Sequence, residues 1–155
     1  MQVDLWLTGK TKGTWVNSAM DDYLQRVQRY CNLNVTIIPE SKNKTAEAIL
    51  RDESKQLKAR LDKSPRAFTI LLDEDGKQYS SRGLAGVISR QQAQGQNYFR
   101  LIIGGAYGVD HDLHRNVDLV LSLSLMTFPH QLVRVILAEQ LYRAFTILRG
   151  EGYHH

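Results

Sequence analysis

Short apolar runs alternate along the whole chain with longer segments that carry apolar side chains at helical spacing. The runs are expected to form strands at residues 2–8, 34–38, 67–72, 98–103 and 118–123. The other segments are expected to form helices at residues 14–30, 45–63, 80–95, 110–116 and 129–148. Strands separated by helices usually pair in parallel, with helices on both faces. The 155 residues therefore predict one α/β domain, 1–155, with a mostly parallel sheet flanked by helices.

The charge is unevenly distributed. Residues 1–66 hold 12 Lys and Arg against 8 Asp and Glu, whereas residues 67–155 hold 8 of each, so the net charge of +4 lies entirely in the first part. An excess of basic residues in the N-terminal part of the chain is compatible with a nucleic-acid partner. We predict phosphate contacts for six basic residues of this region: Lys10, Lys12, Arg26, Arg29, Lys42 and Lys44.

Composition also restricts the compartment. No stretch approaches the ~20 apolar residues of a membrane helix, and the start MQVDLWLTGK lacks the apolar core of a secretory signal. Cys31 is the single cysteine, so an intrachain disulfide and a thiolate metal cluster are excluded. His111 and His114 share a short helix without a third ligand in register. We expect a cytoplasmic protein with no membrane contact and no metal.

The stretch LIIGGAYGVD (101–110) places glycines directly after a predicted strand. A dinucleotide fingerprint needs G-x-G-x-x-G opening a helix near the first strand, and a P-loop needs a terminal Gly-Lys-Ser/Thr. Neither pattern is present. The glycines therefore indicate either close backbone approach to a ligand without phosphate or a plain turn. A separate turn is expected at Asp73-Glu74-Asp75-Gly76, where the strand 67–72 would end.

The segment SLSLMTFPHQLVR (122–134) places hydroxyls between a strand and a helix. An extended backbone over residues 124–129 leaves N–H and C=O groups that need partners. An adenine edge is one such partner, and the loop's own hydroxyls and water are the other. Further along, Glu139 and Arg143 have the i, i+4 spacing of a helical ion pair. The tail Tyr153-His154-His155 is either a frayed terminus or a base and stacking pair.

Taken together, IIGGAYG, SLSLMTFPHQLVRVILAEQLYRA and RGEGYHH closely resemble the SPOUT-superfamily methyltransferases (RlmH-type) that modify N3 of a pseudouridine in 23S ribosomal RNA. The resemblance covers essentially the whole chain. It implies an α/β fold with a C-terminal trefoil knot, an exception to the rule against knots. It also implies S-adenosylmethionine as donor, the large subunit or assembled ribosome as partner, and a homodimer with each active site near the interface.

The resemblance also assigns roles to residues. The cofactor pocket would use Leu72, Gly105, Ser124, Leu125, Met126, Thr127, Phe128 and Pro129. Catalysis would use three residues near the target base: His154 as general base, Arg143 to stabilise negative charge, and Tyr153 to stack on or hydrogen-bond the base. Gly105 would lack a side chain because one would obstruct the cofactor. The chain departs from many relatives at Gly152, where they have proline, and this could loosen the tail.

Two other interpretations remain open at this stage. One is a SPOUT methyltransferase that acts on transfer RNA. The other is a non-catalytic ribosome-assembly factor that binds RNA and has kept the knotted fold. The sequence does not identify the target nucleotide. It also assigns no role to His130, which lies beside the start of a predicted helix.

Overall fold

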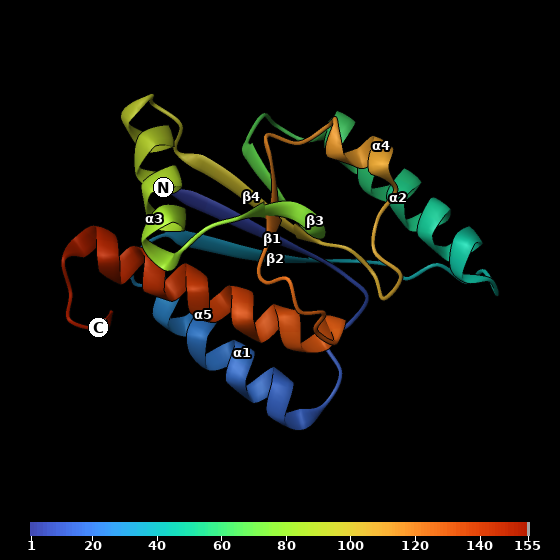
Figure 1. The fold of residues 1–155 in the computed structure, drawn as a ribbon, viewed down its shortest axis with the longest axis horizontal. Coiled ribbons are helices and arrows are strands. Elements are labelled where there is room, and N and C mark those ends of the chain that lie inside the picture. The colour runs from blue at the N-terminus through green and yellow to red at the C-terminus, as the bar shows by residue number, and fades with distance from the viewer. Residues whose placement is uncertain (155) are drawn as a thin grey trace.

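The computed structural model describes residues 1–154, which form a five-stranded sheet between two layers of helices (Figure 1). The strands are β1 (Gln2–Thr8), β2 (Asn32–Ile38), β3 (Phe68–Gln78), β4 (Tyr98–Ile103) and β5 (Leu119–Ser122). The helices are α1 (Thr14–Val27), α2 (Ala46–Lys63), α3 (Ser81–Ala93), α4 (His111–His114) and α5 (His130–Arg149). The strand order is β2-β1-β4-β3-β5, and every pair is parallel. The predicted α/β class with a parallel sheet is confirmed.

The two faces of the sheet bury different side chains because residues alternate along each strand. Leu5 of β1 and Leu101 of β4 pack with α1, α3 and α5 in the larger apolar core. Their neighbours Trp6 and Ile102 face the other way and pack with Leu57 of α2 and with α4. The central strands are therefore apolar on both sides, as expected for a parallel sheet covered by helices.

Strand β3 is longer than the sequence suggested, and the predicted turn after Leu72 is wrong. Leu72 and Lys77 both pair with Leu121 of β5, so residues 73–76 bulge out and the strand then resumes. Gly76 makes this possible, because a Cβ there would lie 2.6 Å from the backbone carbon of Leu121. Only a residue without a side chain allows the two backbones to pass so closely.

The helix starts follow ordinary capping chemistry. The Thr45 side chain accepts a hydrogen bond from the Ala48 N–H at the start of α2, and Ser80 does the same for Gly83 at the start of α3. Helix α5 has no side-chain cap and begins after Pro129, whereas Gly150 ends it in a left-handed conformation. The predicted helices all exist, with ends displaced by a few residues at most.

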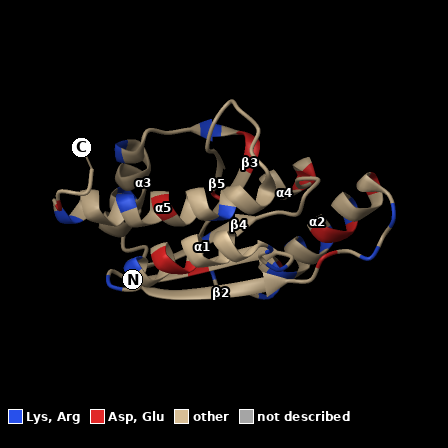
Figure 2. Ribbon diagram, turned by 90° about the horizontal axis from the view of Figure 1, so that it is seen from below, with Lys and Arg blue, Asp and Glu red and all other residues tan. Residues whose placement is uncertain are grey.

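Helices α1 and α5 lie side by side and start at the same edge of the sheet, where the strands end (Figure 1). The carboxyl end of α5 therefore lies near the opposite edge, together with the chain's last described residues. Figure 2 shows basic residues spread along the molecule, at both ends and in the middle, rather than gathered in one patch. The trefoil knot does not follow from strand order and stays a prediction.

Candidate active site

A pocket of about 400 Å³ opens at the carboxyl ends of β3, β4 and β5. Its walls are the β3 bulge (residues 73–75), the loop after β4 (residues 104–109), the end of β5 with the segment after it (residues 121–124 and 126–128) and the first turn of α5. The volume lies within the range of small-molecule sites, ~300–1,000 Å³. Ligands of open α/β sheets bind outside the carboxyl ends of the strands, so this is the expected place for one.

The structure brings together most of the residues that the sequence assigned to a cofactor. Six of them line the pocket: Leu72, Gly105, Ser124, Met126, Thr127 and Phe128. Leu125 and Pro129 do not line it. The Leu125 side chain is 91% exposed, and Pro129 precedes the first residue of α5. The cofactor role of all eight stays a prediction, and Leu123 and His130 join the pocket lining.

An acidic side chain with no signal in the sequence lies directly behind the glycine loop. Glu53 of α2 is only 3% exposed, and its Oε1 accepts a hydrogen bond of 3.0 Å from the Ser41 N–H. Its Oε2 has no hydrogen-bond partner and would lie 2.0 Å from a Cβ on Gly105. Burial raises the pKa of the Glu53 carboxyl. Gly105 therefore lacks a side chain because Glu53 occupies that space, a reason separate from the predicted approach of a ligand.

The hydroxyls of the segment after β5 satisfy part of its backbone. The Ser122 hydroxyl donates to the Ser124 carbonyl at 3.0 Å, and the Ser124 hydroxyl accepts from the Met126 N–H at 2.9 Å. Within residues 1–154, no hydrogen bond involves the backbone N–H of Thr127 or Phe128. The loop thus fixes its own shape at the start and leaves donors beside the pocket further on.

His130 is fixed as a neutral ring at the mouth of the pocket. Gln131 accepts from the Lys12 N–H through Oε1, at 2.8 Å, so its Nε2 is a donor, 2.9 Å from Nε2 of His130. The Arg134 guanidinium, which can only donate, lies 3.4 Å from the same ring nitrogen. Nε2 of His130 is therefore the acceptor and Nδ1 carries the proton. Burial and, secondarily, the Arg134 charge lower the pKa of His130, in agreement with this assignment.

Arg134 is a fully buried cation that joins α5 to the loop after β1. Its Nη2 donates to the Thr8 carbonyl at 2.6 Å, and its Nη1 donates to the Gly9 carbonyl at 2.9 Å and the Thr11 hydroxyl at 3.0 Å. No carboxylate lies within ion-pair distance of it among the described residues, and burial lowers its pKa. The charge is balanced by carbonyl dipoles at the end of β1.

The predicted catalytic residues gather at the other end of α5. The Tyr153 hydroxyl donates to Glu139 Oε1 at 3.1 Å, and Arg143 donates to the same oxygen. Nδ1 of His154 lies 3.5 Å from Nη1 of Arg143. The Tyr153 ring packs edge-on against Tyr142, with centroids 4.7 Å apart. Burial and the neighbouring Tyr23 and Glu139 raise the pKa of Tyr153. The tail is thus docked on α5 rather than frayed.

Comparison with known proteins decides the family. The family model described as "Predicted SPOUT methyltransferase" matches residues 1–154. This chain belongs to the SPOUT methyltransferase family. It is 46% identical over 151 residues to ribosomal RNA large subunit methyltransferase H of Pelobacter propionicus, and 43% identical over 151 residues to that of Geobacter sulfurreducens, covering 97% of each chain. A solved structure of a probable methylase family protein from Haemophilus influenzae shares the fold, with a TM-score of 0.57 at 9% identity over 99% of this chain and 70% of that chain.

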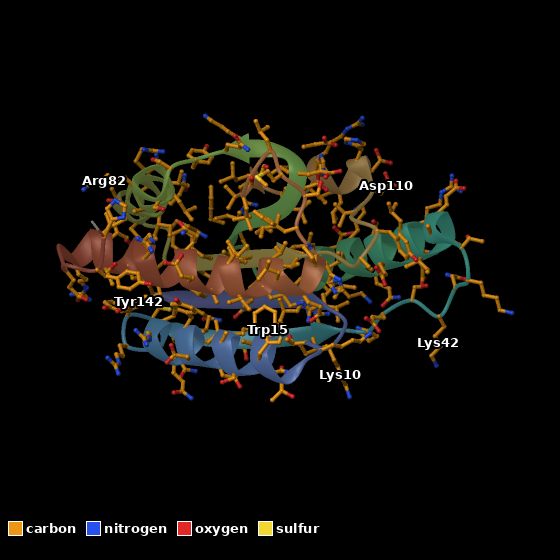
Figure 3. All side chains as sticks on the ribbon, turned by 60° about the horizontal axis from the view of Figure 1, so that its bottom comes forward. Lys10, Trp15, Lys42, Arg82, Asp110 and Tyr142 are labelled. Carbon is orange, nitrogen blue, oxygen red and sulfur yellow. The ribbon has the colours of Figure 1, made fainter. Side chains whose placement is uncertain are left out.

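In this SPOUT protein the pocket and the tail cluster are far apart. His130 lines the pocket and Arg143 belongs to the tail cluster, and at 1.5 Å of rise per residue the helix separates them by about 20 Å. The side chains in Figure 3 show the same division, with Lys10 and Lys42 toward one end of the molecule and Tyr142 toward the other. One copy of the chain therefore does not bring the predicted catalytic residues to the predicted cofactor residues.

The SPOUT chain also carries site residues that sequence reasoning missed. Glu53 gave no signal, because a glutamate in a polar helix usually faces solvent. Arg134 did give one, since it interrupts the apolar run LVRVIL, where a charge is costly unless it is paired. Across residues 1–154, no group of three or more His, Cys, Asp or Glu side chains could hold a metal ion. No helix in this part of the chain is long and apolar enough to cross a membrane.

Proposed function

We propose that this SPOUT protein transfers a methyl group from S-adenosylmethionine to N3 of a pseudouridine in 23S ribosomal RNA, and that it works as a homodimer on the large subunit or assembled ribosome. The observation that carries the proposal is the pocket at the strand ends, which gathers six residues of the cofactor pattern in a chain of this family. The names of the relatives, ribosomal RNA large subunit methyltransferase H, support the RNA target.

The residues present fit this donor. The pocket is about 400 Å³ in volume, and Gly104, Gly105 and Gly108 of the loop after β4 line it together with Ala106, Tyr107 and Val109. The free N–H groups of Thr127 and Phe128 would meet acceptors on the adenine edge, and Leu72 with Leu121 would cover its apolar face. Bound there, S-adenosylmethionine supplies a methyl group already activated on a positively charged sulfur. The chain's own task is then to align the acceptor and remove its proton.

The tail cluster supplies groups for that task. A guanidinium only donates, so Nδ1 of His154, which lies 3.5 Å from Nη1 of Arg143, carries the lone pair of the ring. The target base would displace Arg143 from this lone pair, which would then take the N3 proton. Arg143 keeps Nη1 free of carboxylate and would stabilise the negative charge left on the neighbouring carbonyl oxygens. Tyr153 would donate to or stack on the base. His154→Ala should abolish single-turnover methylation, and an unchanged rate across a pH series would refute the base assignment.

The separation within one chain supports the dimer. Two copies packed with antiparallel α5 helices would bring the tail of each to the pocket of the other. Three large apolar side chains near the carboxyl edge of the sheet are unusually exposed: Trp15 (62%), Leu125 (91%) and Met126 (73%). Exposed apolar groups of this kind mark interaction surfaces. We assign them to the partner copy, which also gives Leu125 a role outside the pocket.

The same arrangement would unite two basic groups that one chain holds apart. Lys10 and Lys12 follow β1, and Lys42 follows β2, so all three lie at the pocket edge of the sheet. Arg26 in the last turn of α1 and Arg29 just after it line a shallow pocket together with Tyr142. In the antiparallel dimer, lysines of one copy and arginines of its partner would flank one active site. RNA phosphates would then bind on both sides of the target base.

One assay tests the proposal. Radiolabelled donor is offered with free transfer RNA, separated ribosomal subunits or assembled ribosomes, and the RNA that gains label is digested to nucleosides. Label on a large-subunit pseudouridine supports the proposal. Label on transfer RNA would favour the transfer-RNA alternative instead, and donor binding without any transfer would favour an assembly factor. Subunit mixing adds a second test, because a pocket-defective chain and a tail-defective chain should regain activity together.

A further inference from the structure

We infer that Glu139 is a positioning residue, which holds Arg143 and Tyr153 in the orientation that methyl transfer requires. The inference rests on the proposed function, since it assigns a role toward that reaction. Sequence spacing alone pairs Glu139 with Arg143 along one helix. The structure adds a third residue, from the tail, to the same carboxylate.

One oxygen of Glu139 accepts three hydrogen bonds. Oε1 lies 2.9 Å from Nε and 2.6 Å from Nη2 of Arg143, and 3.1 Å from the Tyr153 hydroxyl. The guanidinium lies over the Tyr153 ring, 4.8 Å from its centroid. A single acceptor atom therefore sets both the direction of the guanidinium and the place of the tyrosine ring. Hydrogen bonds to an ionised acceptor are about twice as strong as neutral ones.

The other oxygen of Glu139 is anchored to the protein body. Oε2 accepts from Nε2 of Gln140 at 2.6 Å. The amide of Gln140 cannot be reversed without loss, because its Oε1, which accepts from the Ser81 hydroxyl at 2.7 Å, would then face the acceptor-only carboxylate of Glu139. The chain of contacts thus runs from α3 through Gln140 to Glu139 and on to the tail. A carboxylate held on both oxygens cannot swing with the side chain that it positions.

This anchoring decides which guanidinium nitrogen is left for the substrate. Glu139 takes the Nε N–H and one N–H of Nη2 of Arg143, so Nη1 is the nitrogen with no carboxylate contact, and it faces Nδ1 of His154. The Glu139 carboxylate also raises the pKa of Arg143, and it contributes to the raised pKa of Tyr153, so both remain donors. Without Glu139, the guanidinium would be free to turn and the Tyr153 hydroxyl would lose its acceptor.

An ordinary surface ion pair does not account for this arrangement. Glu47 and Arg51 on α2 have the same spacing and a contact of 2.7 Å, but their side chains are 74% and 70% exposed. The Glu139 and Arg143 side chains are 17% and 26% exposed, and the tail covers them. Glu47 therefore provides a matched control, with the same chemistry and no tail.

The test compares Glu139→Ala, the double variant E139Q/Q140E and the control Glu47→Gln in the full-length protein with ribosomes as substrate. Single-turnover rate, KM for ribosomes and Kd for the donor are measured for each. For Glu139→Ala we expect the rate to fall about 100-fold, as for a catalytic group misplaced by about 1 Å, with donor Kd unchanged. The double variant retains an acceptor for both tail groups and a donor toward residue 140, so it should keep most of the rate.

A physical readout of the tail separates this inference from the proposed function. Carboxypeptidase should release the residues after Gly150 faster from Glu139→Ala than from wild type or Glu47→Gln. If the protein methylates no RNA but Glu139→Ala still releases its tail faster, the proposed function is refuted, whereas the conclusion that Glu139 holds the tail on α5 stands. Equal rates of methylation and equal release in Glu139→Ala and wild type would overturn the inference. A rate loss matched by equal loss of donor binding would also overturn it, because that result indicates a general structural defect.

Discussion

Gly105 offers the sharpest test of how the pocket is built, because its missing side chain is required by a residue from the opposite layer. An alanine Cβ at this position would lie 2.0 Å from Oε2 and 2.9 Å from Cδ of Glu53. The carboxylate would have to withdraw by more than 1 Å to reach ordinary contact. That movement would break its hydrogen bond to the Ser41 N–H, now 3.0 Å long.

Two costs add up in Gly105→Ala. Overpacking a buried site destabilises by about 1–3 kcal/mol, and leaving the Ser41 N–H without an acceptor costs about 1–3 kcal/mol more. Together they predict a loss of about 2–6 kcal/mol in the free energy of unfolding. Glu53→Ala alone loses only the hydrogen bond and the packing of the side chain. In the double variant, Gly105→Ala should cost little, so the coupling between the two sites should be nearly as large as the cost of Gly105→Ala alone, about 2–6 kcal/mol.

Urea unfolding of wild type, both single variants and the double variant measures this coupling. Gly86→Ala in α3 is the control, since its Cβ would meet nothing closer than 3.4 Å. Additive changes at Gly105 and Glu53, within about 0.5 kcal/mol, would refute the steric argument. Calorimetry on the double variant then tests whether Gly105 is required by the packing of Glu53 or by the cofactor. Normal binding of S-adenosylmethionine would show that the glycine is needed for Glu53 and not for the cofactor.

Three further predictions follow from buried or clustered charges. Burial raises the pKa of Glu53 above its ordinary value of 4.5. The protonated carboxyl therefore stabilises the fold fully below pH 4.5, and this contribution is lost as the pH rises through the raised pKa. Between about pH 4 and pH 7, the free energy of unfolding of wild type should fall relative to that of Glu53→Gln. Arg134→Ala leaves carbonyls unpaired in the interior and should cost about 3–5 kcal/mol in urea unfolding, whereas a loss below about 1 kcal/mol would contradict its anchoring role. Replacing Lys42 and Lys44 by alanine should reduce the slope of log affinity for ribosomes against log salt by about 2, and an unchanged slope would remove both from the RNA interface.

The sequence predicted the sheet and its helices because periodic apolar patterns report directly on which side of an element is buried. It failed at β3, where strand pairing resumes after the bulge. That outcome depends on two backbones passing at Gly76, and no local pattern encodes such a contact. Six of the eight residues that the family pattern assigned to the cofactor line the pocket. Glu53 was missed because its burial depends on the glycine loop of a distant strand.

Helix α5 connects the parts of the candidate site as a rigid spacer. At its start, Arg134 and Gln131 hold the loop that carries Lys10 and Lys12, and halfway along it Glu139 holds the tail. Because both contacts are fixed by hydrogen bonds, the distance from pocket to tail depends on the helical rise between them, about 1.5 Å per residue. A dimer that places one tail in the other pocket must match that length. Changes within α5 that preserve both anchors should therefore alter methyl transfer through dimer geometry, while donor binding in each pocket stays unchanged.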